Sequence, residues 1–211
     1  MEELLDLDAR PYENAHPLVG FDEKSVERPA DVRSPLPRRR AHAKRRDDEY
    51  QRGGTRNVFL FLEPQAGQRP TFVTLRRTQA DWAKAMREVV DERYPTAARR
   101  EVVLDHLNTH HDEAWIEIFG KAEAERSMSR VVFHDTPVHG RGLNRAEMEW
   151  SVMARPCTRR RWANAFTLAT EWVAWEQPRQ AACVTIRWKF TTRDARRGFA
   201  RYYPDPAISS G

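Results

Sequence analysis

The sequence predicts an α/β fold in which helices flank a mixed, five-stranded β-sheet. Five short apolar runs have the length and composition of strands. Two of them are joined by a short linker, which favours an antiparallel hairpin, whereas the later ones are separated by helical patterns, which favours parallel pairing. The five runs are PLVGFDE at 17–23, NVFLFLEP at 57–64, PTFVTLRR at 70–77, EVVLD at 101–105 and RVVFHD at 130–135.

The first half of the chain supplies the hairpin and the first crossover. Residues 29–56 are rich in Pro and Arg and are expected to form an exposed basic loop or hairpin. The linker QAGQR between the second and third runs contains one Gly, as antiparallel hairpins often do. Residues 79–93 carry apolar side chains at helical spacing, and Pro95 ends the pattern. The strand EVVLD therefore arrives after a helix, and a right-handed crossover into a parallel partner is the natural connection.

The second half is predicted to be mostly helical. A weakly amphipathic helix is expected over 112–128, followed by the strand RVVFHD and a loop, HGRGL. Asn144 is a favourable first residue for the next helix. Two further helices are expected around 163–177 and 192–201.

Length and composition indicate one soluble domain over residues 1–211, because a chain of this size can form one substantial core. The formal net charge of +5 and the pI of about 9.5 favour a polyanionic partner. Two cysteines make no disulfide framework, which indicates a reduced, intracellular setting. The acidic start lacks a signal-peptide pattern, and the apolar run 58–62 is too short to cross a bilayer, so no membrane partner is expected.

Three carboxylates stand at the ends of predicted elements. Asp22 and Asp105 follow apolar strand segments, and Glu147 lies in the first turn of a helix. Strand ends in α/β sheets border a crevice where ligands bind. Carboxylates gathered there would repel one another unless a cation neutralised them, and Mg²⁺ prefers such oxygen ligands.

Each acid also has a purely structural interpretation. Asp22 could be a turn residue, and its neighbour Glu23 is a rival, since strand alternation puts the two on opposite faces. Asp105 could start a loop. Glu147 lies three residues after Asn144, which fits a capping box. Spacing alone does not bring the three acids together.

The blocks around these acids resemble the three catalytic blocks of bacterial insertion-sequence transposases, from the mariner-related branch of the DDE superfamily. The blocks are GFDEK, VVLDHLNTH and HDTPVHGRGLNRAEMEWSVMAR. Four intervening segments are similar as well: DVRSPLP, GTRNVFLFLEPQAG, RRTQADWA and TIRWKFTTRDARR. The resemblance covers nearly the whole chain.

The resemblance implies a ribonuclease-H-like fold, two bound Mg²⁺ or Mn²⁺ ions, and DNA cleavage followed by strand transfer. By position, Asp22, Asp105 and Glu147 would be the catalytic acids and the metal ligands. Nearby polar residues would support the ligands or contact DNA; they are Asn108, His110, His139 and Asn144. The implied partners are double-stranded transposon ends with terminal inverted repeats and target DNA, a homodimer is compatible, and the setting is the bacterial cytosol and nucleoid.

The chain also departs from the family pattern. Arg141 and Gly142 replace a usual Ser-Trp, and Arg145 replaces an apolar residue. Pro156 interrupts an expected helix, and Gly20 replaces a larger residue. Residues 1–16 could not supply the upstream helix-turn-helix domains of whole relatives. These departures support an alternative, a catalytically inactive truncated or decayed remnant that still binds DNA; a host nuclease of similar fold is a third hypothesis.

Other residue patterns have a structural interpretation as well as a functional one. His106, His110 and His111 with Asp112 suggest zinc, but no Glu stands between histidines as in HExxH, so a polar loop is favoured. Three basic runs either track DNA phosphates or form solvated surface: Arg38–Arg40, Lys44–Arg46 and Arg159–Arg161. Four tryptophans are expected in the core rather than as base-stacking platforms: Trp162, Trp172, Trp175 and Trp188.

Overall fold

The computed structural model describes residues 1–31, 50–105, 111–137, 141–153 and 165–198. Five strands form one sheet with the order β3-β2-β1-β4-β5. Their bounds are β1 Leu18–Asp31, β2 Tyr50–Leu62, β3 Thr71–Thr74, β4 Arg100–Leu104 and β5 Val131–Asp135. The predicted mixed, five-stranded sheet is confirmed.

Pairing within the sheet follows the connections. β1, β2 and β3 pair antiparallel in sequence order. β4 pairs parallel with β1, and β5 pairs parallel with β4. The β1–β2 ladder runs out to Asp31 and Tyr50, so the strands extend into the segment expected as a basic loop or hairpin. Residues 32–49 lie outside the described part of the chain.

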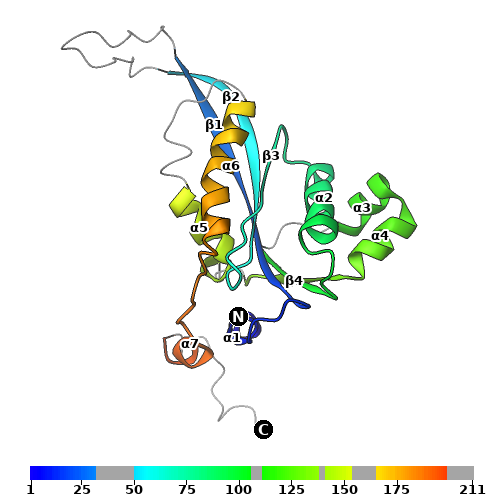
Figure 1. The fold of residues 1–211 in the computed structure, drawn as a ribbon, viewed down its shortest axis with the longest axis vertical. Helices are drawn as coiled ribbons and strands as arrows, with labels where there is room; N and C mark the ends of the chain where they lie inside the picture. Colours follow the sequence, from blue (N-terminus) through cyan, green and yellow to red (C-terminus); the bar gives the residue numbers. More distant parts are fainter. Residues whose placement is uncertain (32–49, 106–110, 138–140, 154–164, 199–211) are drawn as a thin grey trace, which may run out of the picture.

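Seven α-helices are described, and they lie on the two faces and at one end of the sheet (Figure 1). α2 to α4 cover one face, α5 and α6 cover the other, and α1 and α7 lie together at the lower end in this view. The helices are α1 Glu2–Ala9, α2 Gln79–Glu88, α3 His111–Phe119, α4 Lys121–Met128, α5 Arg145–Met153, α6 Ala165–Ala181 and α7 Thr192–Gly198.

Helix boundaries have local causes. α2 begins with a reciprocal capping box between Thr78 and Asp81 and continues into a π-helical turn, Val89–Arg93. The single helix expected over 112–128 is instead two helices, α3 and α4. Gly120 separates them with a φ of 79°, a backbone conformation that costs glycine little but other residues much more.

The two faces of the sheet carry separate apolar cores because β2 is apolar on both sides. Phe59 and Phe61 face α2, where they join a cluster of aromatic rings that includes Trp82 and Trp115. The alternate residues of β2, Val58, Leu60 and Leu62, pack against α5 and α6. The rings of Trp150 and Trp172 meet edge to face there, 5.8 Å apart.

The predicted tryptophan core is confirmed for Trp172, which is fully buried. Trp175 and Trp188 are partly buried and pack against the cores, and Trp162 lies outside the described residues.

The two ends of the described chain pack beneath the sheet. Leu4, Leu5 and Leu7 of α1 are buried against the start of β1, the end of β4 and Ala195 of α7. Arg196 of α7 pairs with Glu2 of α1 at 2.7 Å. Within the described residues, no helix is both long and apolar enough to cross a membrane.

Candidate active site

Asp22 lies on the face of β1 that α5 covers. Glu23 points the other way and pairs with Arg77 at 2.9 Å. Of the two rival acids, strand alternation leaves only Asp22 facing α5. The Glu23 backbone N–H donates to Asp22 Oδ1 at 2.8 Å and restricts the carboxylate.

Asp105 follows β4 directly, beside Asp22. β1 and β4 are parallel neighbours, and Gly20 lies opposite Val103. Two positions further on, β1 reaches Asp22 and the chain after β4 reaches Asp105. The hydroxyl of Thr136, just after β5, donates to Asp105 Oδ1 at 2.8 Å. Thr136 is itself placed by its backbone N–H, which donates to the Leu104 carbonyl at 2.9 Å.

Glu147 is brought to the same place by the start of α5. Asn144 Oδ1 accepts from the Ala146 N–H at 3.1 Å, and Asn144 Nδ2 donates to the Phe21 carbonyl at 2.6 Å. One buried side chain thus caps α5 and ties it to β1 next to Asp22. The capping-box interpretation of Glu147 is wrong, because its side chain is exposed and makes no such bond with Asn144.

Gly20 makes this close approach possible. A Cβ at position 20 would lie 3.0 Å from Asn144 Oδ1 and 3.3 Å from the Ala146 nitrogen. The replacement of a larger residue by Gly20 therefore has a structural reason, because the cap of α5 occupies the space that a side chain at this position would need.

The three acids affect one another electrostatically. The pKa of Asp22 is raised to about 6, first by burial and also by the negative charges of Asp105 and Glu147. The Glu23 N–H opposes this by favouring the charged form. So does Trp150, whose buried indole N–H lies near Asp22 but makes no hydrogen bond. The fold therefore gathers carboxylates from β1, the end of β4 and α5.

The donor set suits a hard divalent cation. Carboxylate oxygens are the ligands that Mg²⁺ and Mn²⁺ prefer. A cation would also offset the repulsion from Asp105 and Glu147, which adds to burial in raising the pKa of Asp22. In the described ranges, no three His, Cys, Asp or Glu side chains are placed so that they could together hold a metal ion.

Arg145, the charged departure from the family pattern, is buried with partners. Its guanidinium forms an ion pair with Asp8 of α1 and stacks on Trp188, with the guanidinium carbon 3.4 Å from the ring centroid. Burial lowers its pKa to about 10, so it stays charged at neutral pH.

Several predicted residues lie outside the described part of the chain. Among the expected supporting or DNA-contacting residues only Asn144 is described. The others are Asn108, His110 and His139. The same holds for Pro156, for His106 of the zinc hypothesis, and for the three basic runs: Arg38–Arg40, Lys44–Arg46 and Arg159–Arg161. Their proposed roles stay predictions.

Residues 17–169 match the sequence model of a protein family, the DDE superfamily endonucleases. The chain belongs to this family. The match spans all three acids and the whole sheet. No curated protein sequence matches the chain.

Solved structures similar to this DDE superfamily endonuclease include three of the Mos1 transposase. The Mos1 strand transfer complex matches with a TM-score of 0.51 and 11% identity over 87% of this chain and 58% of that one. The Mos1 mariner paired end complex with Mn matches with a TM-score of 0.50 and 14% identity, over 87% of this chain and 59% of that one. A pre-cleavage Mos1 transpososome matches with a TM-score of 0.50 and 11% identity, over the same shares of the two chains. The predicted ribonuclease-H-like fold is confirmed, and the chain spans under three-fifths of each Mos1 chain.

Two residues that lie beside the candidate acids were not predicted from the sequence. Thr136 orients Asp105, and Trp150 faces Asp22. Thr136 follows a strand parallel to that of Asp105, so its place at the same sheet edge was a usable signal. Trp150 lies three residues after Glu147 on one helix, a spacing that puts both on one side of α5.

Proposed function

We propose that this chain is the catalytic domain of a transposase that cuts DNA at the ends of a mobile element and joins them to a target. One observation carries the proposal: Asp22, Asp105 and Glu147 come from three separate segments and lie close enough that, after burial, the charges of Asp105 and Glu147 add to the raised pKa of Asp22. Membership of the DDE superfamily endonuclease family supports the same chemistry.

Asp22, Asp105 and Glu147 would hold two Mg²⁺ or Mn²⁺ ions. Such ions, when bound, activate a water or a DNA 3′-hydroxyl for attack on a phosphodiester and stabilise the leaving oxygen. The Mos1 relative was solved with Mn, which supports divalent metal use here. Asp105 would be kept in its ligating orientation by Thr136, and Glu147 by the cap that Asn144 forms.

The proposed partner is double-stranded DNA, as terminal inverted repeats and as target. The net charge of +5 supports a polyanionic partner. The Mos1 structures are named as paired end and strand transfer complexes, and pairing two ends supports a homodimer. Action on DNA would place the protein in the bacterial cytosol, at the nucleoid when bound. Asn108, His110 and His139 are proposed to support the ligands or contact DNA.

The direct test is nicking of a DNA duplex carrying the element's terminal inverted repeats, with and without Mn²⁺. Wild type is expected to nick in Mn²⁺ but not in EDTA. Asp105→Asn keeps the acceptor for Thr136 yet loses a charged ligand, so activity should fall by about 100-fold or more. Glu23→Gln, which alters the neighbouring acid on the opposite face, is the matched control and should retain nicking.

The same assay separates the other hypotheses. A well-folded wild type that takes up no Mn²⁺ and nicks nothing would favour the inactive remnant. Equal cutting of DNA without terminal repeats would favour a host nuclease. Activity that persists in Asp105→Asn would remove this residue from the site.

A further inference from the structure

Arg145 is a buried cation at the first position of α5, two residues before Glu147. Its residue exposure is 3%, although an arginine is rarely buried unless its charge is compensated. Since α5 begins here, any force on this side chain acts on the turn that carries Glu147.

Three groups hold the guanidinium of Arg145 in one orientation. Asp8 accepts from Nη2, and the Leu143 carbonyl accepts from Nη1 at 3.0 Å. The ring of Trp188 covers one face of the plane at 3.4 Å. A lysine could keep the charge but not this combination of a planar fork and a stacked face.

These partners come from both ends of the described chain. Asp8 lies on α1, whose leucines pack against Leu143 and Val103 beneath the site. α1 is held to α7 by the bond from Thr192 to Asp6 at 2.9 Å. Arg145 is thus the point where the two terminal segments meet the helix of the third acid.

Glu147 depends on this backbone for its position. Its side chain is exposed, and no hydrogen bond or ion pair among the described residues restrains its carboxylate. Only the first turn of α5 places it, and that turn is held by Asn144 on one side and Arg145 on the other.

We propose that Arg145 is a positioning residue: clamped by Asp8 and Trp188, it orients the first turn of α5 so that Glu147 completes the metal site. The metal part of this inference rests on the proposed function. The clamp itself does not, so it can be tested without metal.

The test compares Asp8→Asn and Arg145→Lys with Asp6→Asn. Asp6 lies on the same helix and contacts Thr192 rather than Arg145, so it is a matched control. Two readouts are taken on the folded proteins: Mn²⁺ affinity by calorimetry, and amide hydrogen exchange of residues 145–149.

Asp8→Asn and Arg145→Lys should each weaken Mn²⁺ binding by about 10-fold or more, as loss of a supporting contact commonly does. Their α5 amides should exchange faster than in wild type, while Asp6→Asn should match wild type in both readouts. If Arg145→Lys fails to fold, Asp8→Asn decides, because the apolar anchors of α1 remain.

Unchanged Mn²⁺ affinity in both variants, with only a lower melting temperature, would reduce Arg145 to a stabilising role and overturn the inference. If wild type itself binds no Mn²⁺, the proposed function has failed, and the exchange readout alone decides whether the clamp orders α5. Wild-type exchange in the variants would then overturn the inference.

Discussion

Asp22 is unfavourable for folding at neutral pH, yet its carboxylate suits the proposed metal site. Its carboxylate is partly buried beside two other acids, so the folded protein holds a proton to about pH 6 that the unfolded chain releases near pH 3.8. The stabilisation from this proton is complete below pH 3.8 and is lost as the pH rises through 6. At neutral pH, without metal, the three acids repel one another.

Asp22→Asn should therefore stabilise the metal-free protein at pH 7, by roughly 1–2 kcal/mol after allowance for partial exposure. At pH 3.5 the gain should vanish, since Asp22 is then neutral in the folded state and mostly neutral in the unfolded state. Urea unfolding in EDTA at the two pH values measures this. Added Mn²⁺ should stabilise wild type but not Asp22→Asn. Equal stability of the two proteins at pH 7 would contradict the assignment.

α5 is the element on which the site depends, because it alone brings an acid to the sheet from outside it. It approaches β1 so closely that the Asn144 cap leaves no room for a side chain at position 20, where the residue is Gly20. The cap connects local and non-local structure, since one amide bonds both the helix and the Phe21 carbonyl.

Gly20→Ala should displace this helix. The added methyl would press on the Asn144 oxygen and the Ala146 backbone, at an expected cost of about 1–3 kcal/mol. Gly142→Ala is the control: its Cβ would meet nothing within 4 Å, so stability should change by less than about 0.5 kcal/mol. Chemical denaturation measures both. Mn²⁺ affinity should fall only in Gly20→Ala, and equal effects of the two variants would argue against a close strand–helix contact.

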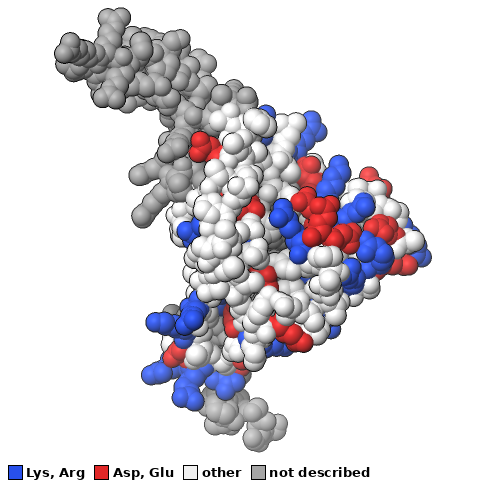
Figure 2. Space-filling view, viewed as in Figure 1, with Lys and Arg blue, Asp and Glu red and all other residues white. Residues whose placement is uncertain are grey.

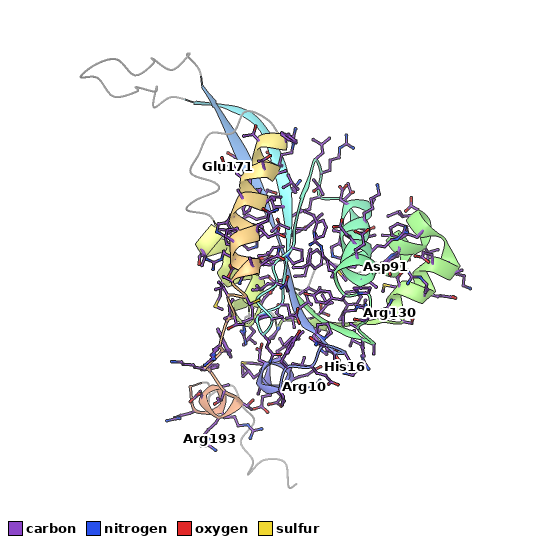
Figure 3. The ribbon with its side chains drawn as sticks, in the orientation of Figure 1. Arg10, His16, Asp91, Arg130, Glu171 and Arg193 are labelled. Atoms are coloured by element: carbon purple, nitrogen blue, oxygen red, sulfur yellow. The ribbon has the colours of Figure 1, made fainter. Side chains whose placement is uncertain are left out.

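On the face of the molecule seen in Figure 2, acids and bases are mixed over α2 to α4, whereas bases gather over α7. The mixed region includes Asp91 and Arg130, whose side chains lie near each other in Figure 3 and are 4.0 Å apart. In the same view Arg193 lies on α7, apart from the sheet. We expect charged pairs buried in the interior, however, to affect the free energy of unfolding more than these surface charges do.

Arg69 connects three segments in the interior. It is fully buried, lies 3.2 Å from Glu149 of α5, and donates to the Val184 carbonyl that follows α6. Arg179 of α6 approaches the same Glu149 at 3.4 Å. This cluster ties the β2–β3 connection to both helices on the site face of the sheet.

Arg69→Met should lower the free energy of unfolding by about 3–5 kcal/mol, because it leaves the buried Glu149 short of its partner. Arg126→Met is the matched surface control. Arg126 pairs with Asp91 and Glu123 but its side chain is 44% exposed, so its loss should cost about 1 kcal/mol or less. Thermal or urea unfolding compares the two. A similar small effect for both would show that the interior cluster contributes little.

The sequence alone determined the strands and most helices, and it singled out the three acids as candidates. Local signals act over only a few neighbouring residues, so they can be recognised in the sequence. They include alternating apolar residues, the capping residue Thr78 and the apolar runs of β2 and β4. The single-helix prediction for 112–128 failed because the positive φ of Gly120 is not evident from amphipathic spacing.

Only the tertiary structure decided how the site is assembled. The parallel register sets Asp22 beside Asp105, and Gly20 admits the Asn144 cap that brings Glu147 to them. The partners of Arg145 are equally non-local: Asp8 is 137 residues away in the chain. Such contacts depend on packing between distant segments, and no local pattern of residue types records which of them will meet.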